Sequence, residues 1–215
     1  MPIFNSVYKS FEQGRLPAEY QEVEYIQSSN TQYINTEVIN QWTTLSVDMK
    51  FIITQTNPSG YEDWLFWAKW STTQSPTVYI WTESLKYLST WCWSNTTYVV
   101  KPIVLNTVHT LTVNYSSSGR TWTYDEESFT SNMWISNNAN NTNWYMSFFS
   151  DGSTPVSKCY MKLYYGKITV NWALVRDLVP CYRKSDSVIG MYDVVNDVFY
   201  TNAGSWTFTK WPDVN

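Results

Sequence analysis

Strict alternation of apolar and polar residues is the feature that most limits how this chain can fold. The segment 44–53, TLSVDMKFII, has apolar residues at every second position: Leu45, Val47, Met49 and Phe51. The segment 109–115, HTLTVNY, repeats the pattern. Because successive side chains of an extended strand point to opposite faces, a period of two predicts β-strands with one face in a core.

Short runs of this kind recur along the chain between turn-forming segments such as NPSG at 57–60, SSSG at 116–119 and NNANNTN at 137–143. The segment 121–130, TWTYDEESFT, is expected to be a single return strand after SSSG. Aromatic residues make up 18% of the chain, which favours strands over helices. Strands do not alternate with helices, and no constant repeat is visible. The sequence therefore predicts an all-β fold, an antiparallel β-sandwich.

The first fifteen residues differ from the rest. Phe4, Val7, Tyr8 and Phe11 recur at the three- and four-residue spacing of one helical face. Such a short amphipathic helix is marginal alone, so it either packs on its own domain or docks on a larger assembly. We expect residues 1–15 to form a docking segment, helical or extended, and residues 16–215 to form one domain.

Charge and hydropathy argue against two classes of partner. The net charge is −4, and the longest basic cluster is Arg183-Lys184, which is too short to follow a phosphate backbone. The N-terminus is too polar for a signal peptide, and no run approaches the roughly 20 apolar residues of a membrane span. We expect no nucleic-acid partner, no membrane partner and folding in a cytoplasm.

Metal and disulfide chemistry is not indicated. The three cysteines, Cys92, Cys159 and Cys181, have no CxxC spacing, and the single histidine, His109, is distant from each in sequence. We expect buried thiols and no bound metal or other cofactor.

The C-terminal region is the most firmly patterned. Residues 174–181 are expected to form a strand that ends at Pro180, after a turn at Asn171-Trp172. Residues 187–202 are expected to form a hairpin that turns around Val195–Asp197, and NAGS at 202–205 makes a further turn.

These residues also carry a resemblance. LPAEYQEVEYIQSSNTQYINTEV (16–38) and LYYGKITVNWALVRDLVPCYRKSDSVIGMYDVVNDVFYTNAGSWTFT (163–209) resemble the two ends of the concanavalin A-like/LamG-like jelly-roll domain of bacteriophage virion proteins and gut-bacterial surface proteins. The resemblance implies two antiparallel sheets face to face, with the first and last strands adjacent. Asp197 stands where that family has Gly after Asn, and NAGS lacks a second Gly, so both departures affect turns only.

Glycoside hydrolysis needs two carboxylates across a cleft, and no E-x-D-x-E run supplies them. Glu22 and Glu24 alternate correctly but lie in the first strand. Glu62-Asp63 and Asp125-Glu126-Glu127 are adjacent residues, which point to opposite faces or lie in turns. No G-x-S-x-G motif is present, and we expect no enzymatic activity.

The aromatic centre leaves three interpretations open: core packing, a protein interface or a sugar platform. In WLFWAKW (64–70), simple alternation places Trp64 with Phe66 on one face and Leu65 with Trp67 on the other. The candidate ligand-binding residues are Trp67, Trp70, Asn143 and Asp151. Asn143 and Asp151 are also candidates for a Ca²⁺ site, although no fixed-spacing motif supports one.

Together these features favour a non-enzymatic bacteriophage virion surface protein: a capsid decoration, head fibre or tail appendage that displays a lectin-like domain. Its expected partners are other virion proteins of the capsid or tail, host or mucosal glycans, and further copies of itself. The alternative is a bacterial carbohydrate-binding adhesin or enzyme-associated module, and a glycoside hydrolase is the third class.

Overall fold

The computed structural model describes residues 15–39, 42–57, 63–68, 76–81, 87–91, 97–131, 145–149 and 159–214. Every regular element within these ranges is a β-strand. In the same ranges, no helix has the length and apolar character needed to cross a membrane. The predicted N-terminal helix with Phe4, Val7, Tyr8 and Phe11 lies outside the described residues.

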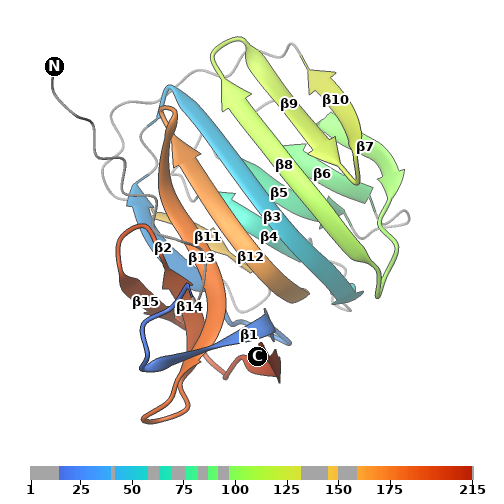
Figure 1. Ribbon diagram of the computed structural model, residues 1–215. Helices are drawn as coiled ribbons and strands as arrows, with labels where there is room; N and C mark the ends of the chain where they lie inside the picture. The colour runs from blue at the N-terminus through green and yellow to red at the C-terminus, as the bar shows by residue number, and fades with distance from the viewer. Residues whose placement is uncertain are drawn as a thin grey trace, which may run out of the picture.

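Ten strands form a large antiparallel sheet in the order β10-β9-β8-β3-β12-β1-β13-β14-β15, with β16 paired to β1 (Figure 1). Their bounds are β1 (Tyr20–Gln27), β3 (Thr44–Gln55), β8 (Val108–Ser116), β9 (Gly119–Tyr124), β10 (Glu127–Ser131), β12 (Tyr160–Val170), β13 (Ala173–Arg183), β14 (Ile189–Asp193), β15 (Val198–Thr201) and β16 (Thr209–Asp213).

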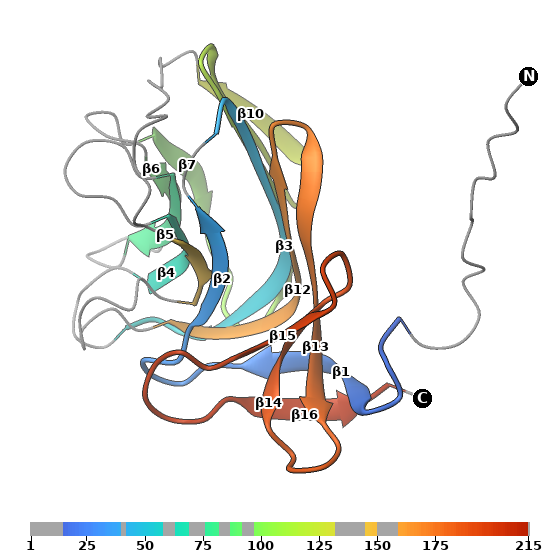
Figure 2. The same ribbon diagram turned by 90° about the vertical axis from the view of Figure 1, so that its left-hand side faces the viewer.

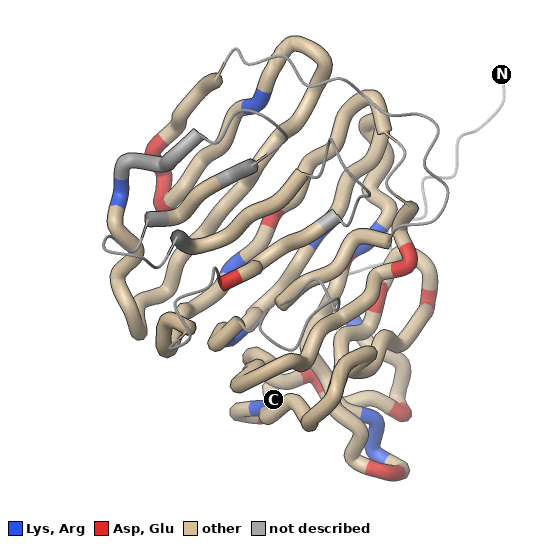
Figure 3. The backbone as a smooth tube through the Cα atoms, turned by 180° about the vertical axis from the view of Figure 1, so that it is seen from behind, with Lys and Arg blue, Asp and Glu red and all other residues tan. Residues whose placement is uncertain are grey.

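Six strands form a small sheet in the order β2-β11-β4-β5-β6-β7. Their bounds are β2 (Ile34–Ile39), β4 (Asp63–Ala68), β5 (Thr77–Trp81), β6 (Tyr87–Trp91), β7 (Thr97–Pro102) and β11 (Tyr145–Phe148). Figure 2 shows the two sheets edge-on as two layers, with β1, β14, β15, β16 and the C-terminal half of β13 gathered at one end. The small sheet is nearest the viewer in Figure 3.

The core lies between the two sheets and follows from the alternation in the sequence. Leu45, Val47, Met49 and Phe51 of β3 are all at most 1% exposed. From the small sheet, Phe66 and Phe148 pack with ring centroids 5.3 Å apart. Each such buried side chain contributes about 1.5–3 kcal/mol relative to exposure. The predicted β-sandwich is confirmed.

The two ends of the chain close the large sheet, as expected. The start of β1 pairs with the end of β13, where Tyr20 lies opposite Arg183. The rest of β1 pairs with β16, where Tyr25 lies opposite Trp211. The predicted 187–202 hairpin is present as β14 and β15, and Asp197 has the left-handed φ of 56° that its turn requires.

Two predictions about strand limits are wrong. Strand β13 does not end at Pro180 but continues to Arg183. Pro180 lies where the partner of β13 changes from β12, at Leu178, to β1, at Cys181, so its missing N–H disturbs the sheet least there. Residues 121–130 are two strands, because Asp125 and Glu126 adopt left-handed φ values of 46° and 71° and turn the chain back.

Gly190 provides a test of this closing hairpin. A Cβ there would overlap the carbonyl oxygen of Tyr200 and lie 2.8 Å from Phe199 Cε2. We expect Gly190→Ala to lower the free energy of unfolding by about 1–3 kcal/mol, measured by urea titration. Gly166→Ala is the comparison, because the three atoms nearest to its Cβ would all belong to the side-chain ring of Phe148, the closest at 2.7 Å, and none to the backbone. A larger loss for Gly166→Ala than for Gly190→Ala would contradict this packing.

Candidate functional site

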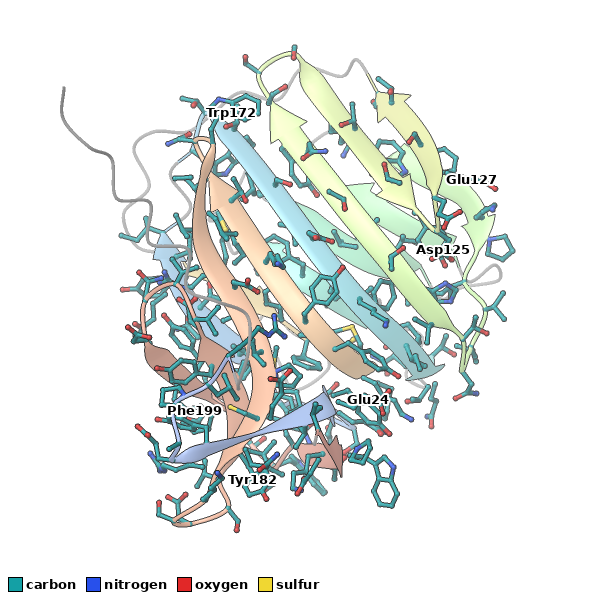
Figure 4. All side chains as sticks on the ribbon, in the orientation of Figure 1. Glu24, Asp125, Glu127, Trp172, Tyr182 and Phe199 are labelled. Atoms are coloured by element: carbon teal, nitrogen blue, oxygen red, sulfur yellow. The ribbon has the colours of Figure 1, made fainter. Side chains whose placement is uncertain are left out.

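Trp172 is held at the tip of the β12–β13 hairpin, on the same end of the molecule as the β8–β9 turn (Figure 4). Val170 pairs with Ala173, so Asn171 and Trp172 form a two-residue loop. Their φ values are 49° and 69°, the pattern of a type I′ turn. The indole is 86% exposed. The predicted turn is therefore confirmed, and a large aromatic side chain occupies its tip.

The turn is fixed to the start of β3 by Asn171. Its side-chain oxygen accepts hydrogen bonds from the Thr43 amide (2.7 Å), the Thr43 hydroxyl (2.8 Å) and the Thr44 amide (3.2 Å). The Asn171 amide also donates to the Thr44 carbonyl at 2.9 Å. These four contacts hold the backbone on which Trp172 stands.

A tryptophan is an unfavourable choice for this position. The second residue of a type I′ turn is usually glycine, because a side chain in the left-handed region costs about 1–2 kcal/mol. Residues held in such conformations cluster at ligand sites, where the strain is retained for a purpose other than stability. Trp172 combines this backbone strain with an exposed indole, and so marks a candidate site.

A groove of about 590 Å³ lies beside Trp172. Most of the described residues that line it carry hydroxyl or amide side chains, and none is Asp, Glu or Lys. They are Thr44, Leu45, Ser46, Asn114, Tyr115, Ser116, Ser118, Gly119, Arg120, Thr121, Thr130, Ser131, Thr169 and Trp172. The groove thus offers mostly neutral hydrogen-bonding groups, together with the buried Arg120 and two aromatic residues, the buried Tyr115 and the exposed Trp172.

Five of these residues form a polar row across the large sheet, on the face that points away from the core. The strand registers pair Thr169 with Ser46, Ser46 with Asn114, Asn114 with Thr121, and Thr121 with Thr130. Paired residues on adjacent strands lie about 4.8 Å apart, so the row extends for roughly 19 Å. Within it, the Asn114 side-chain amide donates to the Thr121 hydroxyl at 3.3 Å.

Sequence reasoning placed the turn at Asn171-Trp172 but missed Trp172 as a site residue. The position of Trp172 in the turn could have identified it. A bulky aromatic residue after Asn, between two strands, stands where turn chemistry favours Gly.

Trp67, which the sequence singled out, lies on the outer face of the small sheet, and the predicted alternation around it is wrong. A β-bulge falls between Trp64 and Phe66. As a result Phe66 faces the core, while the rings of Trp64 and Trp67 are 4.2 Å apart, edge to face. Trp64 also contacts Tyr79, with ring centroids 4.9 Å apart. Trp67 is half-buried, and its role in ligand binding stays a prediction.

The other predicted ligand residues, Trp70, Asn143 and Asp151, lie outside the described residues. In the part of the chain that the structure describes, no three His, Cys, Asp or Glu side chains come together to hold a metal ion. The Ca²⁺ site predicted from Asn143 and Asp151 stays a prediction. Cys159 and Cys181 are free and buried, and burial raises the pKa of the Cys181 thiol to about 12.

The carboxylate of Asp125 links the β9–β10 turn to neighbouring residues of β8. One carboxylate oxygen accepts a hydrogen bond from the Thr110 amide at 2.9 Å, and the other lies 2.6 Å from Nδ1 of the buried His109. The Tyr124 hydroxyl is 2.8 Å from the same nitrogen, and His109 Nε2 lies 2.9 Å from the Val104 carbonyl oxygen. These contacts fasten the β9–β10 turn to β8.

Asp63 is the carboxylate with the most perturbed environment. It is fully buried, and one of its oxygens accepts a hydrogen bond from the Asn57 amide at 3.0 Å, whereas the other has no hydrogen-bond partner among the described residues. Desolvation by burial raises its pKa to about 7, against the lowering effect of the Asn57 bond. Among the described residues, no second carboxylate contributes to this shift.

Comparison with known proteins supports the fold. Neither models of protein families nor a search of curated proteins gives a match. Among solved structures, a proposed carbohydrate-binding protein from Bacteroides ovatus is similar, with 10% identity, a TM-score of 0.56 and coverage of 90% of this chain and 62% of that one. The enzymatically active domain of bacteriophage CBA120 tailspike protein 2 has 8% identity, a TM-score of 0.51 and coverage of 75% and 30%.

A heptameric SAP-like pentraxin from Limulus polyphemus is more distant, with 9% identity, a TM-score of 0.46 and coverage of 69% of this chain and 74% of that one. The chain spans less than two thirds of the Bacteroides protein and less than a third of the tailspike domain. At these identities the similarities establish the fold alone. The chain is an antiparallel jelly-roll β-sandwich, as the sequence predicted.

The buried Asp63 makes stability depend on pH. Its folded pKa of about 7 lies above the ordinary value of 3.8, so the folded state binds the proton more tightly. Stability should therefore fall as the pH rises from about 4 to 7, and the full loss, on the order of 2–4 kcal/mol, should be present above pH 7. We expect Asp63→Asn to remove this part of the pH dependence, measured by urea unfolding at pH 5 and pH 8. Equal pH dependence in both proteins would show that Asp63 is not the cause.

Proposed function

We propose that this chain is a glycan-binding module and that the groove beside Trp172 holds the sugar. The observation that carries this proposal is the strained, exposed Trp172 next to a row of neutral hydroxyl and amide side chains. The apolar face of a sugar ring stacks on an indole, and its hydroxyl groups hydrogen-bond with Thr, Ser and Asn side chains. The five side chains of the row are uncharged, and the one charged residue that lines the groove, Arg120, is buried, so a neutral ligand suits the site.

Rigidity supports the same proposal. The four contacts of Asn171 fix the loop before any ligand arrives. The polar row stands on five strands of one sheet, whose backbone is likewise ordered. Ordering of side chains and loops is one of the main costs of association, so a preformed site retains more of its contact energy as affinity.

We further propose that the module is non-enzymatic and is displayed on the surface of a bacteriophage virion, with residues 1–15 docking on a capsid or tail protein. The resemblance of residues 16–38 and 163–209 to virion jelly-roll domains supports this assignment, as does the spacing of Phe4, Val7, Tyr8 and Phe11. The groove supports a proposed role in adhesion to host or mucosal glycans. A bacterial adhesin or enzyme-associated module would use the same groove in another setting.

Trp172→Gly separates binding from stability. The change removes the indole and also creates an Asn-Gly type I′ turn, so we expect stability to rise by about 1 kcal/mol while glycan binding is lost. The measurements are urea unfolding and a glycan array probed with the full chain. A loss of binding that accompanies a gain in stability cannot come from misfolding.

Trp206→Gly is the matched control. Trp206 is also exposed, at 69%, and also has a left-handed φ, of 74°, but it lies in the loop before β16 and does not line the groove. We expect it to keep full glycan binding. If both variants lose binding equally, or if the unaltered chain binds no glycan, the groove is not a sugar site.

Deletion of residues 2–15 tests the docking segment. We expect the truncated chain to keep its fold and its glycan binding but to be missing from purified phage particles, as measured by immunoblot of particles from infected cells. Normal incorporation of the truncated chain would contradict the docking role of residues 1–15.

A further inference from the structure

A second β-bulge, in β12, places two adjacent tyrosines on the outer face of the large sheet. The register shifts between Leu163 and Tyr165, so that Tyr164 is the extra residue. Leu163 and Gly166 on either side are buried in the core face. The Tyr165 hydroxyl donates to Asp48 at 3.3 Å, which leaves Tyr164 directed to the other side, toward β1. Bulges often re-aim side chains next to functional sites.

Tyr164 belongs to an aromatic row that crosses to the edge of the sheet. Its ring centroid lies 5.3 Å from that of Tyr25 on β1. Tyr25 in turn pairs directly with Trp211 on the edge strand β16, so their side chains share one face. Trp211 is 67% exposed. The row Trp211-Tyr25-Tyr164 therefore ends in an accessible indole.

In the described part of the chain, four lysines lie over tyrosine rings, and two of the four also form an ion pair with a carboxylate. Lys167, over Tyr165, forms an ion pair with Asp177 at 3.2 Å. Lys210, over Tyr182, forms one with Asp213 at 2.8 Å.

The other two lysines are those of the aromatic row. Lys50 Nζ lies 5.1 Å from the Tyr164 ring centroid, and Lys162 Nζ lies 4.5 Å from that of Tyr25. Neither forms an ion pair with any described residue. The two ammonium groups without a carboxylate are therefore those on the two tyrosines that contact each other.

We propose that this surface, which we call the lysine–tyrosine surface (Tyr25, Lys50, Lys162, Tyr164 and Trp211), binds a carboxylated saccharide. Sugar carboxylates supply the missing partners of Lys50 and Lys162, and the Trp211 indole supplies a face for a sugar ring. The tyrosine rings hold each ammonium group in place, which reduces the entropy lost on binding. This surface does not depend on the Trp172 groove, because Tyr164 and Thr169 are five residues apart on β12, about 17 Å.

The charges nearby favour a saccharide over a nucleic acid. Next to the two lysines without an ion pair stands the exposed Glu24, because the pKa of Tyr164 is raised by burial, the larger cause, and by the charge of Glu24. Two positive charges and one negative charge suit spaced carboxylates. They do not suit the continuous charge of a phosphate backbone, which requires many cations along one track.

The test uses the full chain with polygalacturonate and polysialate as probes, and the carboxyl-reduced form of each, by calorimetry at low ionic strength. We expect binding to one of the two acidic polymers and not to its reduced form, with affinity that falls as salt is added. Lys50→Gln/Lys162→Gln should weaken that binding about tenfold, and Lys50→Arg/Lys162→Arg should retain it. The polymer that binds distinguishes uronate from sialate.

Lys167→Gln/Lys210→Gln is the matched control, since it removes the same charge from lysines that already have carboxylate partners. We expect it to change the affinity less than twofold. Equal weakening by both double variants would show non-specific attraction, and binding of neither acidic polymer would refute the proposal. Trp172→Gly should leave this binding intact, so that failure of the groove and failure of the lysine–tyrosine surface are separate results.

Discussion

The pairing of β1 with β12, β13 and β16 is the contact on which the rest of the structure depends. One eight-residue strand from the start of the chain is hydrogen-bonded to three strands from its end. Sequence separations of this size make the pairing entropically costly to form, and the buried side chains of both sheets must offset that cost. The same pairing places Tyr25 opposite Trp211. It also fixes the register of the first residues of β12, the strand that carries residues of both candidate surfaces.

Much of the fold could be predicted from the sequence because burial leaves a direct trace in it. The alternation in β3 and β8 and the closing hairpin β14–β15 follow from apolar period and turn chemistry. The contact between the chain ends was implied by the resemblance of residues 16–38 and 163–209 to the jelly-roll family. The predicted end of β13 at Pro180 was wrong, because the rule that proline ends a strand considers only the strand itself. Whether a missing N–H matters depends on the neighbouring strand, and at Pro180 the neighbour changes.

The candidate sites were harder to predict for the same reason. The bulges at Leu65 and Tyr164 each add one residue to a strand, which breaks the period of two, and only the partner strand reveals where the register shifts. Simple alternation therefore separated Trp64 from Trp67 and did not bring Tyr164 to the face of Tyr25. Trp172 was visible as a turn residue, but its exposure and the groove beside it depend on β3, β8 and β9. The residues of the candidate sites are thus those that break strand alternation or the glycine preference of a turn.

The common strand β12 has a consequence for long ligands. Thr169 of the groove and Tyr164 of the lysine–tyrosine surface stand on one face of it, about 17 Å apart. A polysaccharide with neutral and acidic units would be able to engage both surfaces at once, and its second contact would then be intramolecular. The effective concentration for such a contact is in the millimolar range for short flexible connections, so two weak contacts would act as one strong one. If both proposed surfaces bind glycan, the rigid strand between them would make affinity depend on polymer length.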